Sequence, residues 1–417
     1  MVIKQNYLIT TENLKTQTQF SINKKYSLVL GHSRYATSYQ SLETKTDIYL
    51  SHPFEGTHGI LGTFHLIHNG NINFNEDVKK LYPKLTDTKI LVKFIEKENG
   101  DSWQKVISNI IRKVPGVYNV ILAADNKLFA FKDRFNLRPL CFGENQYGFC
   151  VASESVALGT YTYNREIVGG EMLEISTNGY KISKVIENDS RICLFEFIYF
   201  LNKDTKFNDI AVHSFRYNLG FELAKLENIE DISTQNIVVI GSPDTGIPSG
   251  KGFADKMDFE YQQFLEKNKN SGRSFILKDD QSRTQECNKK FLINPEFNIN
   301  GKIVYFVDDS IVRGITTKKI ISILKHHGAA EIHIRISSPK IIDICKFGID
   351  IPTKDELVMN RMSEAEYVAE YGINSLKYLP LENMRNVIGS GLGISDPEKS
   401  FCIGCFGGGY DKSLLDW

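Results

Sequence analysis

Two adjacent carboxylates, Asp308 and Asp309, directly follow a run of strand-forming residues at 303–307. A short loop comes next, and two hydroxyl side chains, Thr316 and Thr317, open a helix-like segment that continues to residue 325. Paired carboxylates can hold ribose hydroxyls or a magnesium ion. The free N–H groups and positive dipole end of a helix start suit a phosphate. These residue types, in this order, therefore predict a site for a phosphate beside a group that binds carboxylates, either ribose hydroxyls or a magnesium ion.

The elements that must position these side chains are a strand, a loop and a helix. Such a unit places the acids at the carboxyl end of the strand, beside the helix N-terminus. The alternative is an ordinary buried strand–helix unit with two solvated aspartates. We favour the binding site because acid pair, loop and helix occur in the required order.

Composition is that of a globular enzyme. The 417 residues are enough for two domains, 41% of them are hydrophobic and the formal net charge is zero. Net charge therefore gives no support for a nucleic-acid or membrane partner. No apolar run is long enough to span a membrane, and the first residues lack the core of a signal peptide. We expect a cytoplasmic protein with no nucleic-acid and no membrane partner.

The segment VDDSIVRG at 307–314 resembles the glutamine phosphoribosyl pyrophosphate (PRPP) amidotransferase family, also called amidophosphoribosyltransferases. VVIGSPDTGIPSGKGFA at 238–254, HIRISSPK at 333–340 and FGIDIPTKDEL at 347–357 continue the resemblance, which covers most of residues 191–406. It implies catalysis by Asp308, Asp309 and Arg273. It also implies that PRPP and its phosphates are bound, with Mg2+, by Asp244, Thr245, Gly246, Lys267, Arg283, Lys290, Ser310, Arg313, Gly314, Thr316 and Thr317. In the family, the stretch that here runs through Arg273, Arg283 and Lys290 is a flexible loop that closes over PRPP.

One position in the phosphate loop departs from the family. The family's Arg-Gly-Thr-Thr becomes Arg-Gly-Ile-Thr-Thr here, with Ile315 after Gly314. One hydroxyl that would bond the phosphate is lost, and a neutral hydrogen bond contributes about 0.5–1.5 kcal/mol. We expect weaker phosphate binding, or a pocket adjusted to another nucleotide.

The first half resembles the N-terminal-nucleophile glutaminase domain of the same family, on LGHSRYATSYQS (30–41) and FHLIHNGNINFNED (64–77). The resemblance implies that Arg34 would grip the glutamine α-carboxylate and that Asn69 and Gly70 would form the oxyanion hole. Asp87 stands where the family binds the glutamine α-amine, but Lys89 replaces the family's Glu. We treat Arg34, Asn69, Gly70 and Asp87 as a vestigial glutamine site.

The start of the chain is the decisive departure. The family glutaminase begins with a cysteine whose own α-amine serves as its base. This sequence begins Met-Val, and its first cysteine is Cys141. We therefore expect no glutamine hydrolysis by the usual route. A shortened or misplaced start is the alternative.

The seven cysteines are at 141, 150, 193, 287, 345, 402 and 405. An odd count without an export signal argues against a disulfide framework. Some family members hold a 4Fe-4S cluster with four separated cysteines, and the resemblance implies Cys193, Cys345, Cys402 and Cys405 as the ligands. A zinc site and four buried free thiols are the alternatives.

The fold class implied is α+β and α/β. The resemblance implies that residues 1–185 form an αββα N-terminal-nucleophile-type glutaminase-like domain, and that residues 186–417 form a type I phosphoribosyltransferase domain with an iron–sulfur tail. Three functions remain open. They are phosphoribosyl transfer to ammonia or a partner-delivered nucleophile, a role in modified-purine (6-thioguanine-type) synthesis with an ATP-dependent partner that delivers nitrogen or sulfur, and a non-catalytic nucleotide-sensing scaffold. We also expect a homo-oligomer.

Overall fold

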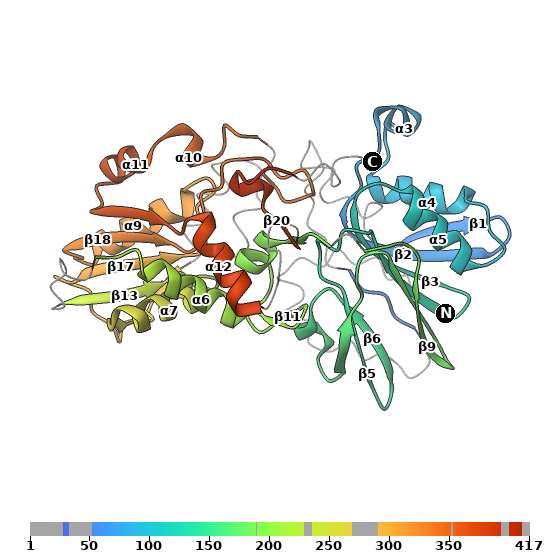
Figure 1. Cartoon of the computed structure of the whole chain (residues 1–417), viewed down its shortest axis with the longest axis horizontal. Helices are drawn as coiled ribbons and strands as arrows, with labels where there is room; N and C mark the ends of the chain where they lie inside the picture. The colour runs from blue at the N-terminus through green and yellow to red at the C-terminus, as the bar shows by residue number, and fades with distance from the viewer. Residues whose placement is uncertain are drawn as a thin grey trace. The chain divides into compact units, whose positions relative to one another are not determined.

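The computed structural model describes residues 28–32, 52–188, 190–228, 236–268, 291–351, 353–392 and 400–410. The chain divides into two units. Unit 1 comprises residues 1–192, 346–348 and 412–417, and unit 2 comprises residues 193–345 and 349–411. Each unit is built around its own sheet (Figure 1).

Unit 1 contains a six-stranded antiparallel sheet with the strand order β1-β2-β3-β4-β8-β9. Its strands are β1 (Phe54–His58), β2 (Gly62–Asn71), β3 (Val117–Ala124), β4 (Lys127–Lys132), β8 (Glu171–Ser176) and β9 (Gly179–Lys184). A three-stranded sheet, β6-β5-β7, is formed by β5 (Cys141–Asn145), β6 (Gly148–Ala152) and β7 (Thr162–Glu166). The helices are α3 (Glu76–Leu81), α4 (Asp87–Lys97) and α5 (Trp103–Lys113).

Helices α4 and α5 cover one face of the six-stranded sheet because each carries an apolar stripe. In α5, Val106, Ile107, Ile110 and Ile111 recur at helical spacing and are fully or almost fully buried. They join Phe64, Leu66 and Phe129 of the sheet in one core. A second, smaller cluster joins Ala130 and Leu173 of this sheet to Phe142 of the three-stranded sheet. The described part of unit 1 is thus a helical layer and two sheets, which fits the expected glutaminase-like sandwich.

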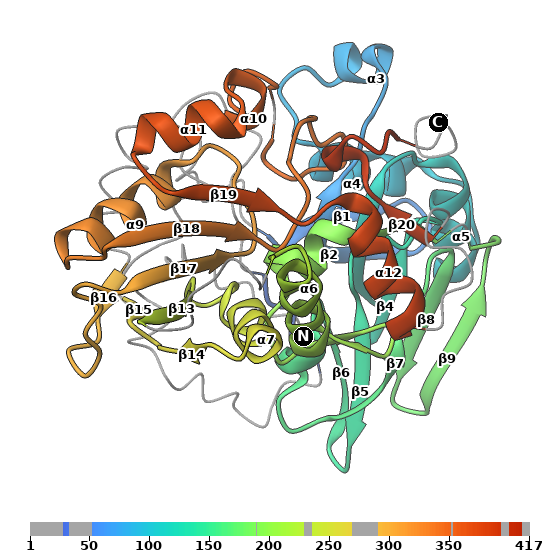
Figure 2. The ribbon, with the colours of Figure 1, turned by 60° about the vertical axis from the view of Figure 1, so that its left-hand side comes forward.

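Unit 2 is organised around a parallel sheet with the order β14-β13-β17-β18-β19 (Figure 2). Its strands are β13 (Ile237–Gly241), β14 (Glu260–Tyr261), β17 (Ile303–Asp308), β18 (Glu331–Ile336) and β19 (Ser375–Tyr378). The smaller pairings are β10 (Ile192–Cys193) with β20 (Phe401–Cys402), β11 (Lys206–Phe207) with β12 (Ile210–Ala211), and β15 (Leu265–Lys267) with β16 (Phe291–Ile293). The helices are α6 (Val212–Ala224), α7 (Ile247–Met257), α9 (Ile315–His326), α10 (Val358–Arg361), α11 (Glu364–Tyr371) and α12 (Leu381–Leu392).

Both faces of the parallel sheet are covered, so its central strands are continuously apolar. All residues of β13 and residues 304–308 of β17 are buried. Helices α9 and α11 pack on one face through Ile320, Leu324 and Tyr367, while Phe253 of α7 stacks on Tyr305 of the other face. Figure 1 shows α9 and α11 above the strands and α6 and α7 below them. Within the described ranges, no helix is long and apolar enough to cross a membrane.

Candidate functional site

The acid pair lies where the sequence predicted, at the carboxyl end of β17. Asp308 is the last residue of the strand and Asp309 follows it, with 5% and 4% of their surfaces exposed. The Asp309 amide donates to the Asp308 carboxylate at 2.9 Å. The Ser310 hydroxyl donates a hydrogen bond to Asp309 Oδ2 at 2.6 Å. The Ser310 hydroxyl therefore helps to orient the Asp309 carboxylate.

The loop after β13 meets the acid pair because β13 and β17 are neighbouring parallel strands. The Thr245 hydroxyl donates to Asp309 Oδ1. A side chain on Gly246 would place its Cβ 2.8 Å from the Val307 carbonyl oxygen, so only glycine allows this approach. Lys267, in β15, forms a 3.0 Å ion pair with Asp244. The structure therefore brings together the loop of Asp244, Thr245 and Gly246, the acid pair and one of the expected cations.

The start of α9 forms the third side of the site. Gly314 is the helix N-cap with φ +80°, a left-handed conformation that glycine adopts without strain. Ile315, Thr316 and Thr317 make up the first turn, where the helix amides have no partner inside the helix. Helix α9 is twelve residues long, and its dipole places partial positive charge at these amides, which attracts an anion.

Arg313 does not point freely toward a phosphate. Its Nε donates to Glu356, and one terminal nitrogen lies 3.4 Å from the Asp350 carbonyl oxygen. Its side chain is only 8% exposed. The backbone N–H of Val358 also donates to the Val312 carbonyl oxygen at 2.9 Å, so Asp350, Glu356 and Val358 all contact the loop before α9. Glu356 was not singled out from the sequence, because nothing local marks a residue whose partner lies 43 positions away.

The expected glutamine-site residues of unit 1 are placed on and after β2. Gly70 has φ +150°, and a Cβ there would lie 2.1 Å from the Val117 carbonyl oxygen. Asn69, beside it, is exposed. The Asp87 carboxylate already accepts from the backbone N–H of Ile72 at 3.2 Å and of Thr88 at 2.8 Å. Lys89 places its ammonium 5.5 Å from the centre of the Phe54 ring.

Four expected site residues, Arg34, Arg273, Arg283 and Lys290, lie outside the described residues. Three of them belong to the stretch 269–290, which connects β15 to β16 in the sequence. Lys267, at the end of β15, is the expected phosphate-binding residue nearest to that stretch.

The four cysteines expected as cluster ligands come together in unit 2. Burial raises the pKa of the Cys405 thiol well above its usual value, and the nearby Cys193, Cys345 and Cys402 raise it further. The backbone places them: β20 carries Cys402, and the Cys405 carbonyl oxygen accepts from Ile342 and Asp343 at 3.0 and 3.1 Å. Four thiols so close disfavour each other's ionisation, unless a positively charged centre compensates.

The donor set can also be tested against single ions. Among the described residues, no group of three or more His, Cys, Asp or Glu side chains has the geometry to hold one metal ion. A cubane cluster binds each cysteine to a different iron and so spreads the sulfurs more widely than one zinc ion does. Magnesium, for its part, is commonly held by one or two carboxylates together with substrate phosphates rather than by a complete protein cage. The residues present fit both of these groups.

Comparison with known proteins addresses the ancestry of this arrangement. A glutamine amidotransferase domain profile matches residues 53–160, and a phosphoribosyl transferase domain profile matches residues 222–340. The amidophosphoribosyltransferase of Bacillus subtilis is 33% identical over 399 residues, covering 92% of this chain and 80% of the relative. The human amidophosphoribosyltransferase is 32% identical over 427 residues, covering 93% and 78%. The chain belongs to the amidophosphoribosyltransferase family.

Solved structures of the family agree with the fold. The glutamine PRPP amidotransferase from B. subtilis, solved with ADP and GMP, matches with a TM-score of 0.75 and 32% identity, covering 91% of this chain and 82% of that one. A second structure, that of an allosteric regulatory enzyme of purine biosynthesis, has the same TM-score and identity over 87% of this chain and 78% of that one. The expected order, a glutamine amidotransferase domain followed by a type I phosphoribosyltransferase domain, is thereby confirmed.

Proposed function

We propose that this amidophosphoribosyltransferase homologue transfers the phosphoribosyl group of PRPP to ammonia, or to a nucleophile delivered by a partner enzyme. The observation that carries the proposal is Asp309, held between the hydroxyls of Thr245 and Ser310. Through this contact the loop after β13 and the acid pair after β17 share one site next to the start of α9. A helix start suits a phosphate and carboxylates suit ribose hydroxyls, so these parts side by side suit a phosphorylated ribose that carries a pyrophosphate.

In the proposed reaction the bond from ribose C1 to the pyrophosphate oxygen breaks while the nitrogen lone pair of ammonia forms a bond to C1. The nitrogen then loses a proton to solvent. Asp308 and Asp309 orient the ribose hydroxyls, and the first turn of α9 holds the 5′-phosphate. The amides of residues 244–246, with Lys267 and Arg273, hold the pyrophosphate. Bound magnesium would supply positive charge to the departing pyrophosphate.

We further propose that glutamine is not the nitrogen source. Lys89 places a cation where the family has a carboxylate, and this cation disfavours binding of the glutamine α-amine. The Asp87 carboxylate is engaged by two backbone N–H groups, which directs it toward anchoring the start of α4. Residues 1–185 would then serve as a structural or partner-binding domain, and residues 186–417 would carry the chemistry.

A 4Fe-4S cluster bound by Cys193, Cys345, Cys402 and Cys405 is the third part of the proposal. It is supported by the mutual effect of these thiols on the pKa of Cys405 and by their separation along the chain. Such a cluster would tie the C-terminal segment at 401–406 to β10 and to the segment after β18. We expect its loss to loosen the C-terminal segment.

The test is pyrophosphate release from PRPP and magnesium, measured on anaerobically purified protein with ammonium, with glutamine, or with neither. Release with ammonium but not with glutamine is the expected result. Release driven by glutamine would overturn the proposed loss of glutaminase activity. No release with either donor, from folded protein, would favour a modified-purine role with an ATP-dependent partner, or a nucleotide-sensing scaffold. Sedimentation of the same sample reports whether the expected homo-oligomer forms.

A further inference from the structure

Tyr367, on α11, lies directly behind the start of α9. Its side chain is fully buried. A Cβ added to Gly314, the N-cap of α9, would lie 3.8 Å from both the Tyr367 hydroxyl oxygen and its ring carbon Cε2. The hydroxyl is therefore aimed at the backbone of the phosphate loop.

This hydroxyl makes no hydrogen bond to any residue that the structure describes. A buried polar group without a partner is costly, and native structures rarely keep one without a use. Thr317, in the first turn of α9, is 2% exposed, and a side-chain hydrogen-bonding contact with it lowers the pKa of Tyr367. This contact does not satisfy the geometry of a hydrogen bond in the structure. Burial outweighs this effect and raises the pKa of Tyr367, as does the nearby charge of Asp308. The hydroxyl thus keeps its proton at physiological pH and remains a donor.

We propose that Tyr367 is a positioning residue of the phosphate site. This inference rests on the proposed function of the α9 start. When a phosphate binds, Thr317 turns its own proton toward a phosphate oxygen, and its oxygen accepts the proton of Tyr367. The chain Tyr367–Thr317–phosphate then satisfies the buried donor and strengthens the outer bond through polarisation. It offsets, in this chain, the hydroxyl that is absent at Ile315.

The mechanism predicts opposite effects on the free and the ligand-bound protein. In Tyr367→Phe, removal of an unsatisfied hydroxyl should leave the melting temperature of the free protein unchanged or higher. The dissociation constant for ribose 5-phosphate should rise roughly 2- to 13-fold, the range for one neutral hydrogen bond. KM for PRPP should rise by a similar factor, while kcat at saturating PRPP stays near that of the wild type.

Tyr371→Phe is the matched control. Tyr371 lies on the same helix and packs against the Tyr367 ring with centroids 4.4 Å apart, but its hydroxyl is not among the neighbours of Thr317. The affinity of the Tyr371→Phe variant for ribose 5-phosphate should equal that of the wild type. A double variant with Thr317→Val should bind no more weakly than Thr317→Val alone, because the Tyr367 hydroxyl then has no acceptor to act through.

Two results would overturn the inference while the proposed function stands: wild-type affinity in Tyr367→Phe, or a variant that unfolds or melts at a lower temperature. The second result would mean that the hydroxyl supports only the fold. If the wild type itself neither binds ribose 5-phosphate nor releases pyrophosphate, the proposed function fails, and the inference fails with it.

Discussion

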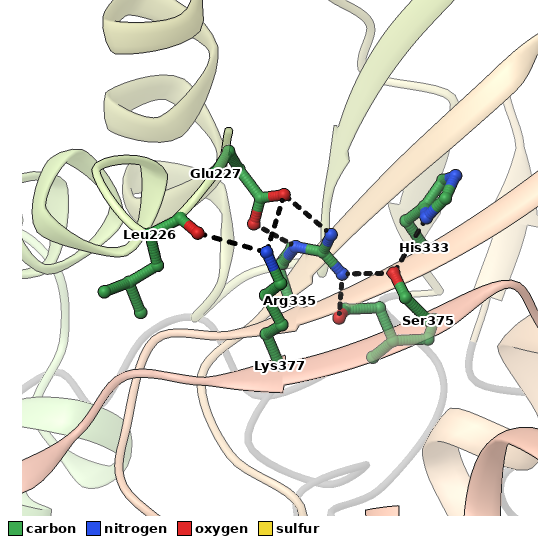
Figure 3. Close-up of polar contacts among 7 residues, drawn as sticks. Leu226, Glu227, His333, Arg335, Ser375 and Lys377 are labelled. Atoms are coloured by element: carbon green, nitrogen blue, oxygen red, sulfur yellow. Dashed lines mark hydrogen bonds and ion pairs between the residues drawn. The ribbon is translucent and has the colours of Figure 1, made fainter. Parts of the chain in front are cut away.

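The Arg335 guanidinium forms a two-point ion pair with the Glu227 carboxylate, at 2.7 and 3.0 Å, across 108 residues of sequence (Figure 3). Both side chains are almost fully buried, at 2% and 4% exposure. Lys377 Nζ donates to the same carboxylate at 3.1 Å, and Ser375 accepts from Arg335 at 2.8 Å. The guanidinium also lies 5.0 Å from the centre of the Tyr305 ring. The network joins the segment after α6 to strands β17, β18 and β19.

Breaking this network from one side should be costly. Glu227→Gln leaves Arg335 buried without its counter-charge, and removal of one partner of a buried pair costs about 3–5 kcal/mol. Denaturant unfolding of the variant should reveal a loss of this size. The control is Glu260→Gln, whose ion pair with Lys302 involves a carboxylate that is 57% exposed. A loss in Glu227→Gln no larger than in the control would contradict the assignment.

The same residue predicts a pH dependence. Burial alone would raise the pKa of Glu227, but Arg335 and Lys377 outweigh it and hold the pKa below its usual value. A depressed carboxyl pKa contributes stability at neutral pH that is lost as the pH falls through the folded-state value. Between neutral pH and about pH 3, wild-type stability should therefore fall more steeply than that of Glu227→Gln. If the stabilities of the wild type and of Glu227→Gln fell in parallel over this pH range, the depressed pKa of Glu227 would be refuted.

The buried Lys132, in β4, should make the stability of the fold depend on pH in the alkaline range. Its side chain is fully buried and donates to Asn136 and to the Arg138 carbonyl oxygen, and burial lowers its pKa to about 8. Between pH 8 and about 10.4 the unfolded chain binds a proton that the folded chain has released, so this residue adds stability as the pH rises. Lys132→Met should lack that rise, whereas Lys127→Met, whose side chain is 37% exposed, should keep it. Stability measured at several pH values checks both variants.

Glu356→Gln tests whether Arg313 anchors the phosphate loop or binds the phosphate itself. If the ion pair holds the loop, KM for PRPP should rise about 3- to 10-fold, the effect of one charged hydrogen bond discounted for partial exposure. A lower KM would instead mean that the released guanidinium binds the phosphate directly. Glu364→Gln, which breaks the more exposed pair with Lys340, should leave KM unchanged.

Cys345→Ser should remove the proposed cluster. Serine oxygen is a poor substitute for a thiolate ligand, so iron and sulfide content and visible absorption should fall to background. The C-terminal segment at 401–406 should also become easier to cleave with protease. Cys150→Ser is the control, because Cys150 belongs to β6 of unit 1 and should leave iron content intact. Full iron content in Cys345→Ser would refute the ligand assignment.

Local pattern was enough to predict the core of the candidate site. The acid pair, the loop and the start of α9 occupy one continuous stretch, and a strand that is buried on both faces has an unmistakably apolar sequence. The positions of Asp308 and Thr317 follow from the sequence because chain connectivity alone keeps them within one strand–loop–helix unit. The family resemblance likewise rested on continuous segments, and the comparisons confirmed it.

Contacts between distant parts of the chain were decided only by the tertiary structure. Thr245 meets Asp309, and Arg313 meets Glu356, because parallel pairing brings separate strand ends and their following segments to one edge. In each of these pairs, the sequence around one residue does not indicate which distant residue it contacts. The same holds for Tyr367, which by sequence is one more aromatic residue of an amphipathic helix. Only the packing of α11 against the sheet turns its hydroxyl toward the phosphate loop, since burial and direction are properties of the assembled core rather than of residue type.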